Sequence, residues 1–322
     1  MKVEQIYTGC LAQGAYYIIS NGEAAIVDPL REVQPYMEKL QKDGVQLKYV
    51  FETHFHADFV SGHLDLSKKT GAAIVFGPNA KTEFEAIIAE DNQIFEIGNI
   101  KIKVLHTPGH TMESTTYLLL DENGEEHAIF SGDTLFIGDV GRPDLAQKAA
   151  NLTQEQLAAH LYQSIRKKIM TLPDEVLVYP AHGAGSACGK NLSTETMSTI
   201  GEQRKTNYAL QFTDIEKFVD VVTEGQPPAP GYFAYDAQRN GQERDVLDEH
   251  AVLKKLSISE VAKHIDSGAV VLDTRNPQLF AMGHIVGSIN VGMDGRYAEY
   301  AGAVVSPGTN IVIATDEGHE HE

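Results

Sequence analysis

The sequence THFHADF (residues 53–59) follows a short apolar stretch, residues 49–51, that is typical of a buried strand. Its polar residues His54, His56 and Asp58 alternate with apolar ones, so a loop at the end of a strand can direct all three side chains into one pocket. Imidazole nitrogens and carboxylate oxygens are common ligands of transition metals. The stretch therefore predicts a metal site at the end of a strand.

Three later segments repeat this pattern, in which a strand is followed by a ligand-capable residue beside Gly or Ala. They are PGHT with His110, SGDT with Asp133 and PAHG with His182. A single buried histidine is more often a hydrogen-bonded core residue than a ligand. Four such segments are hard to explain in that way, because buried His and Asp are costly unless they are paired or bind a metal. We therefore expect one shared metal centre.

The order of these motifs, HxHxD, GH, GD and AH, resembles the metallo-β-lactamase superfamily over roughly residues 7–190. The resemblance implies an α/β protein with an αββα sandwich and metal ligands at the strand ends. Turn residues Asn21-Gly22 predict a hairpin. Hydrophobic periodicity predicts helices at 33–43, 64–70, 153–172 and 193–224, and strands at 16–20, 24–27, 48–52, 73–76, 94–97, 100–106, 115–120, 127–131 and 176–179.

The number of metal ions depends on the residue after Asp58. Members of the superfamily with two metals have HxHxDH, whereas Phe59 stands at the last position here and cannot bind a metal. Only Asp58, His182 and a share of Asp133 would remain for a second ion. The sequence therefore favours a single metal.

The rest of the sequence resembles the persulfide dioxygenases. In that family iron is held by two His and one Asp, which map onto His54, His110 and Asp133. Two histidines and a carboxylate on one face suit an oxygen-using Fe(II), here one per chain. His56, Asp58 and His182 are then expected to orient the ligands or to hydrogen-bond water and substrate.

Two further segments bear on the substrate. GDVGRPDL (residues 138–145) resembles a family segment near the active site, which implies that Arg142 holds the anionic end of a thiol substrate or orients its loop; a structural ion pair with Asp144 or Asp139 is the alternative. HGAGSACGKN (residues 182–191) resembles the bacterial dioxygenases fused to rhodanese modules, which favours coenzyme A persulfide or a similar small persulfide over a glutathione one. Cys188 is a catalytic candidate as a persulfide-handling thiol, or an inert core residue.

The C-terminal segments LDTR (272–275) and GHIVGSINV (283–291) resemble a rhodanese domain. Rhodaneses carry sulfur on a cysteine after a later strand, but the matching strand, 311–314, is followed by Thr315 and Asp316. This partial module is therefore expected to be inactive and to pack against another surface. We assign residues 1–240 to the dioxygenase domain, 241–255 to a linker and 256–322 to the rhodanese-like domain. The Pro- and Gly-rich stretch 225–231 marks a turn or boundary, followed by irregular chain.

Composition narrows the class of protein. The formal net charge of −19 repels nucleic acids and anionic lipids. Two cysteines do not suggest a disulfide framework, and no signal peptide or membrane span is evident. We expect a cytoplasmic, homo-oligomeric enzyme that acts on a small persulfide and O₂, with a sulfurtransferase or an active rhodanese module as a further partner.

The leading hypothesis is thus an Fe(II) persulfide dioxygenase that gives sulfite and thiol in sulfide detoxification. One alternative is a zinc-dependent thioester hydrolase similar to glyoxalase II, with Asp58 as the base and Phe59 as the feature against it. A second is a non-enzymatic, sulfur-responsive scaffold.

Overall fold

A computed structural model describes residues 1–249, 251 and 253–320. Its larger part contains two six-stranded sheets. The strands of the first sheet lie side by side in chain order: β1 (Lys2–Thr8), β2 (Gln13–Ser20), β3 (Glu23–Val27), β4 (Gln46–Glu52), β5 (Ala73–Phe76) and β6 (Ile87–Ile88). The predicted hairpin joins β2 to β3, with Ser20 opposite Glu23 across Asn21-Gly22.

The second sheet has the strands in reverse chain order. They are β12 (Ser198–Thr199), β11 (Leu177–Pro180), β10 (Glu126–Gly132), β9 (Thr115–Leu120), β8 (Ile100–His106) and β7 (Ile94–Ile97). Most neighbours are antiparallel, but β10 and β11 are parallel. Their carboxyl ends, which precede Asp133 and His182, therefore meet at the same edge of the sheet.

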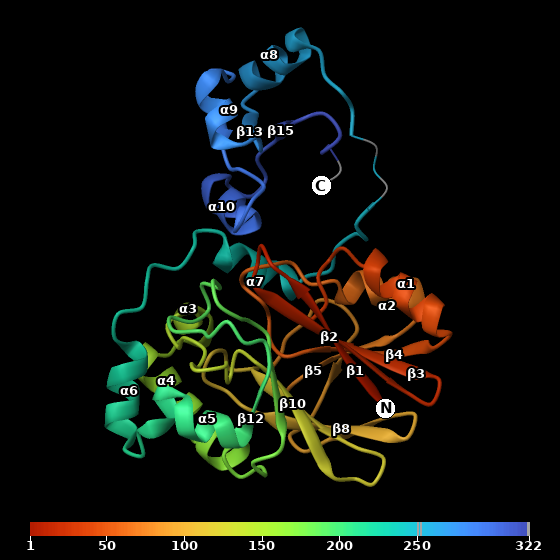
Figure 1. The fold of residues 1–322 in the computed structure, drawn as a ribbon, viewed down its shortest axis with the longest axis vertical. Helices are drawn as coiled ribbons and strands as arrows, with labels where there is room; N and C mark the ends of the chain where they lie inside the picture. The colour runs from red at the N-terminus through yellow and green to blue at the C-terminus, as the bar shows by residue number, and fades with distance from the viewer. Residues whose placement is uncertain (250, 252, 321–322) are drawn as a thin grey trace.

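The two sheets pack face to face, with helices on both outer faces (Figure 1). Aromatic side chains from both sheets fill the space between them, including Phe51 against Tyr117 and Tyr16 against Phe130. Helices α1 (Gln34–Asp43) and α2 (His63–Thr70) cover the first sheet. The second sheet is covered by α4 (Gln154–Ser164), the π-helical turn Ile165–Ile169, α5 (Ile200–Thr206) and α6 (Ile215–Thr223). This is the predicted αββα sandwich.

The C-terminal part is a smaller α/β unit. Its parallel sheet has the order β14 (Ile289–Asn290), β13 (Val270–Asp273), β15 (Ile311–Ala314). Helices α8 (Ile258–Asp266), α9 (Pro277–Met282) and α10 (Tyr297–Val304) surround it. The Ser257 side chain caps α8, and Glu260 completes a capping box with it.

Several predicted elements were wrong. Residues 232–240 are not irregular, because Phe233–Asn240 form helix α7, whose first turn is buried in the large domain. Residues 193–197 are not helical. In the rhodanese-like segment 283–291, Ile289–Asn290 pair as a strand. In the linker 241–255, Arg244 is buried and donates to the Ser61 carbonyl, so its first part is fixed to the large domain. Residues 250 and 252 lie outside the described residues.

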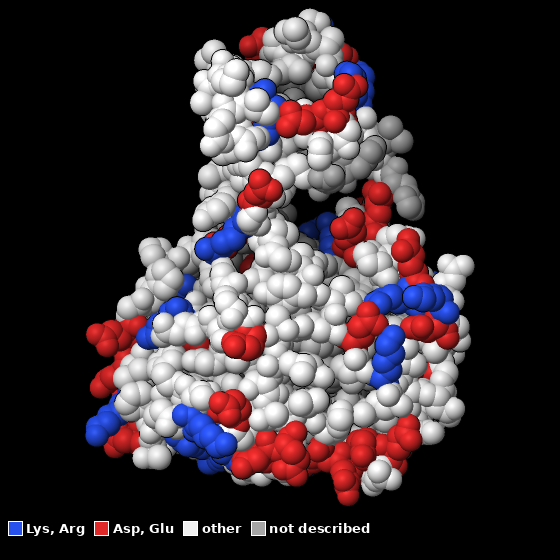
Figure 2. All heavy atoms as spheres, viewed as in Figure 1, with Lys and Arg blue, Asp and Glu red and all other residues white. Residues whose placement is uncertain are grey.

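The surface carries the strong acidic excess of the sequence. Figure 2 shows Asp and Glu side chains gathered on the large domain at the end away from the C-terminal unit. Such a surface keeps like-charged polymers at a distance. Within the described part of the chain, no helix has both the length and the apolar character needed to span a bilayer.

Candidate metal centre

His54, His110 and Asp133 converge at the ends of three strands. Asp133 Oδ2 lies 3.4 Å from His110 Nε2 and 3.8 Å from His54 Nε2. One ligand atom from each residue lies within 4.8 Å of the others, and all three side chains are buried. These separations suit three groups that contact one ion rather than one another. The structure thus brings together the three residues that the sequence predicts as ligands.

Hydrogen bonds fix the orientation of both histidines. The Thr53 hydroxyl lies 3.0 Å from His54 Nδ1 and donates to Asp28 Oδ2 at 2.8 Å. His110 Nδ1 lies 2.9 Å from the carbonyl oxygen of Arg142. In each ring, Nδ1–H can therefore donate outward while Nε2 keeps its lone pair for the metal. Burial, together with the neighbouring histidines, holds the pKa of His54 well below its usual value, which favours this neutral, ligating form.

Two glycines allow the ligand loops to approach closely. Gly132 has φ +52°, and a Cβ there would lie 2.5 Å from the hydroxyl oxygen of Thr53. A Cβ on Gly141 would lie 1.9 Å from the carbonyl oxygen of Asp133. Real Cβ atoms do not come this close to other atoms. Gly132 and Gly141 are therefore required by the close packing around the centre.

A second group of polar side chains adjoins the first. His182 Nε2 lies 3.4 Å from Asp58 Oδ2 and 3.6 Å from Asp133 Oδ1. His56, Asp58 and His182 also have ligand atoms within 4.8 Å of one another. The ring of Phe59 stacks on His56 at 4.4 Å and supplies no ligand atom. The residues predicted to surround the ligands thus lie next to them, and they form a cluster that is itself capable of holding a metal.

His56 also belongs to a buried network on its other side. Its Nε2 lies 3.0 Å from Asp28 Oδ1 and 3.6 Å from Glu52 Oε2. Burial opposes the charge on His56, but Asp28 and Glu52 outweigh it and raise its pKa to about 9. Burial raises the pKa of Glu52 to about 8. Both groups therefore hold a proton more tightly in the folded chain than in the unfolded one.

The stability of the metal-free protein should fall as the pH rises from about 6.5 to about 9, the interval between the ordinary and raised pKa values of His56. The reason is that folding takes up protons at His56 and Glu52, so alkaline conditions favour the unfolded state. In Glu52→Gln the fall should be shallower. Urea unfolding at both ends of this range measures it, with the exposed Glu96→Gln as control. An equal slope in Glu52→Gln and the wild type would contradict the assignment.

Arg142 is buried, and all three nitrogens of its guanidinium group donate hydrogen bonds to the protein. Its Nε and one Nη form a fork with the Asp144 carboxylate at 2.8 and 2.7 Å. The remaining donors reach the carbonyl oxygens of Ala187 and Pro227. Asp139, the other predicted partner, instead accepts from the backbone N–H of Lys190 and Asn191. These contacts favour loop orientation over direct substrate binding as the role of Arg142.

Cys188 lies beside the centre with its side chain 1 % exposed. Its sulfur groups with Asp133 and His182 within 4.8 Å. Burial, Asp133 and Asp58 raise the pKa of its thiol well above the ordinary value, which favours the protonated form over the nucleophilic thiolate. Its position is that of a residue lining the pocket, and a role as a persulfide-handling thiol stays a prediction.

Sequence reasoning did not select several residues that shape the site. Asp28 and Thr53 hold His54, and the Asn240 amide donates to the carbonyl oxygens of His56 and Phe59. Asp28 directly follows the apolar strand β3, as Asp133 directly follows β10, and this similarity was the signal that could have identified it. Asn240 has no such signal, because its partners lie far away in the sequence.

The donor set fits a bound metal. Both Asp133 carboxylate oxygens, both His182 ring nitrogens and Asp58 Oδ1 are buried without a hydrogen-bond partner in the described part of the chain. Leaving one buried polar group unpaired costs about 1–3 kcal/mol, so several at one point indicate a site that binds a ligand. Neutral imidazoles with carboxylates suit iron or zinc.

Family comparisons agree with this geometry. The profile of the Metallo-beta-lactamase superfamily matches residues 8–182, and that of the Rhodanese-like domain matches residues 257–321. The first match covers more than half of the chain. The protein therefore belongs to the metallo-β-lactamase superfamily and has a rhodanese-like domain at its C-terminal end, as the sequence motifs predict.

Individual relatives differ in their named activities. The chain is 32 % identical over 210 residues to the mitochondrial persulfide dioxygenase ETHE1 of Homo sapiens, covering 65 % of this chain and 74 % of that protein. It is 30 % identical over 219 residues to a hydroxyacylglutathione hydrolase of Prochlorococcus marinus (62 % and 85 %). A crystal structure of a metallo-beta-lactamase from Staphylococcus aureus matches with a TM-score of 0.87 and 32 % identity, over 97 % of this chain and 91 % of that one.

Proposed function

We propose that this protein is a non-haem Fe(II) persulfide dioxygenase with one iron per chain. The observation that carries the proposal is the cluster of His54, His110 and Asp133 beside Phe59, where members with two metals have a ligating histidine. A triad of two histidines and one carboxylate leaves positions open for substrate and O₂. Similarity to a persulfide dioxygenase and the rhodanese-like domain support a sulfur substrate.

The reaction is balanced when one persulfide, one O₂ and one water give one thiol, one sulfite and two protons. Iron would supply the electronic coupling that lets a sulfur anion react with O₂. Thr53 and the Arg142 carbonyl keep the rings of His54 and His110 in the ligating tautomer. His182 Nε2 and Asp58 Oδ1 offer polar atoms to the substrate or to water. Coenzyme A persulfide, or a similar small persulfide, is the proposed substrate.

A zinc-dependent thioester hydrolase is the second candidate. The specific observation in its favour is the cluster of His56, Asp58 and His182, which offers ligands for another ion. The similarity to hydroxyacylglutathione hydrolases points in the same direction. In that case Asp58 would serve as the base for an attacking water. The two candidates differ in metal identity, in metal count and in the need for O₂.

Metal analysis and O₂ uptake separate these candidates. We expect about one iron per chain in protein produced with iron, and O₂ consumption with coenzyme A persulfide. Phe59→His should add a ligand beside Asp58 and His182, and thereby raise zinc binding towards two ions per chain. Iron-loaded protein without O₂ uptake on coenzyme A or glutathione persulfide would overturn the proposal. Two zinc ions and thioester cleavage by the wild type would favour the hydrolase.

A further inference from the structure

The side chain of Tyr232 is an unexplained polar group near the metal centre. It precedes helix α7, is 7 % exposed, and its hydroxyl is buried without a hydrogen-bond partner among the described residues. Buried tyrosine hydroxyls usually find a partner, because an unmade hydrogen bond is costly. The position therefore suits a phenol whose partner arrives from outside the chain.

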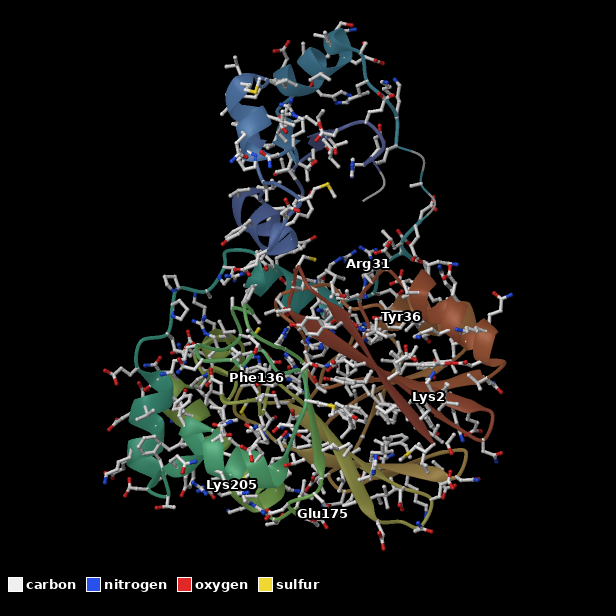
Figure 3. All side chains as sticks on the ribbon, in the orientation of Figure 1. Lys2, Arg31, Tyr36, Phe136, Glu175 and Lys205 are labelled. Atoms are coloured by element: carbon white, nitrogen blue, oxygen red, sulfur yellow. The ribbon has the colours of Figure 1, made fainter. Side chains whose placement is uncertain are left out.

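On one side, Tyr232 lies close to residues of the metal centre. Its ring packs in a cluster with Phe136, Cys188 and Phe233. Phe136, labelled in the interior in Figure 3, meets the ring of His182 edge-on at 6.1 Å. Cys188 in turn lies with Asp133 and His182. Tyr232 thus belongs to the same cluster of side chains as Cys188, which adjoins the metal centre.

The electrostatic surroundings keep this phenol as a hydrogen-bond donor. Burial, followed by the nearby Asp58, Glu299 and Cys188, raises the pKa of Tyr232. A protonated phenol donates to anions but does not compete with the carboxylates for a cation. The ligand chemistry that matches it is an anionic or strongly polar group, such as the terminal sulfur of a persulfide.

On its other side, Tyr232 is held by the C-terminal unit. A Cβ on Gly302 of α10 would lie 3.0 and 3.2 Å from two carbon atoms of the Tyr232 ring, so the helix backbone contacts the ring directly. Glu299, one turn earlier on α10, is the second residue of that helix to influence the phenol. Figure 1 shows α10 next to α7 at the junction of the two units.

We propose that Tyr232 is a substrate-contacting residue of the metal centre and that helix α10 of the cysteine-less rhodanese-like unit holds it in position. The inference rests on the proposed function, because it assigns the phenol to the anionic sulfur of the persulfide. It gives a unit without a nucleophilic cysteine a positioning role. Gly302 is the contact point, since a Cβ there would lie only 3.0 Å from the ring and a large side chain would displace it.

Tyr232→Phe tests the contact by removing only the hydroxyl. A hydrogen bond to a charged group corresponds to about a tenfold to hundredfold change in affinity. We expect KM for coenzyme A persulfide to rise by this factor while the melting temperature and iron content stay unchanged. Tyr235→Phe, in the first turn of α7 and 47 % exposed, is the matched control. Calorimetric titration of the zinc-loaded, redox-inactive protein with coenzyme A should show weaker binding to Tyr232→Phe than to the wild type and Tyr235→Phe.

Gly302→Leu tests the positioning by α10, with Ala303→Leu on the exposed side of the helix as its control. Gly302→Leu should raise KM as Tyr232→Phe does. A variant with both Gly302→Leu and Tyr232→Phe should have a KM no higher than either single variant, because both changes act through the same hydroxyl group. If the wild type is active but Tyr232→Phe leaves KM and coenzyme A affinity unchanged, the inference is overturned and the proposed function stands. A wild type that consumes no O₂ overturns the proposed function.

Discussion

Asp133→Ala is expected to abolish metal binding while it raises the stability of the metal-free protein. Asp133 is the group that both His54 and His110 approach, and its two carboxylate oxygens lack hydrogen-bond partners in the described structure. Loss of a residue that only hydrogen-bonds to a metal ligand lowers metal affinity by roughly 10–100-fold. Loss of the ligating carboxylate itself should therefore lower metal affinity by more than about 100-fold. Without metal, removing an unpaired buried carboxylate should add about 1–3 kcal/mol to the free energy of unfolding.

Elemental analysis and thermal unfolding, with and without a chelator, measure the two effects of Asp133→Ala. The exposed Asp220→Ala on α6 is the control and should change neither quantity. In the wild type, metal should raise the melting temperature, because it binds only the folded state. In Asp133→Ala, metal should no longer do so. A metal-free variant less stable than the metal-free wild type would show that Asp133 has a structural partner instead of serving an ion.

The sequence could predict which polar side chains meet at this centre, because each one lies shortly after the end of a strand. His54, His110, Asp133 and His182 come a few residues after the apolar strands β4, β8, β10 and β11. The sandwich places the ends of these strands together, so proximity in space follows from the fold once the strands are known. The hairpin at Asn21-Gly22 was equally predictable, since its turn geometry is a local property.

The residues that support the ligands were not predictable in this way. The amide of Asn240 reaches residues 56 and 59, which lie about 180 positions earlier in the chain. Tyr232 contacts Gly302 of α10, which lies 70 positions later in the chain. Neither contact leaves a local pattern, because each depends on where α7 packs. Helix α7 itself was missed because it is short and follows the stretch GQPPAPG, which indicates irregular chain.

The Cys188 and Arg142 predictions illustrate a different limit. Their motifs placed both residues near the metal centre, where the structure has them, but motifs do not reveal how a side chain is used. Burial disfavours the thiolate of Cys188. The guanidinium group of Arg142 donates hydrogen bonds to Asp144 and to two carbonyl oxygens. Both roles depend on partners, which only the three-dimensional arrangement supplies.

Arg142→Met should therefore act on stability and metal affinity rather than on KM. The substitution removes the buried ion pair with Asp144 and the hydrogen bonds to Ala187 and Pro227. Loss of these interactions should lower the free energy of unfolding by about 3 kcal/mol. Metal affinity should fall by about tenfold or more, because the Arg142 side chain fixes the loop whose backbone carbonyl at Arg142 holds the ring of His110.

Urea unfolding, metal titration and steady-state kinetics distinguish the two roles of Arg142. Arg142→Lys keeps the charge but loses the fork, so it should recover little of the stability if orientation is what matters. Lys101→Met, which breaks an exposed ion pair with Glu96, should have almost no effect. Metal-loaded Arg142→Met could instead be as stable as the wild type and have a KM raised about tenfold or more, the effect of losing a hydrogen bond to a charged group. That result would show that the guanidinium group binds the substrate and that its contacts with Asp144 are secondary.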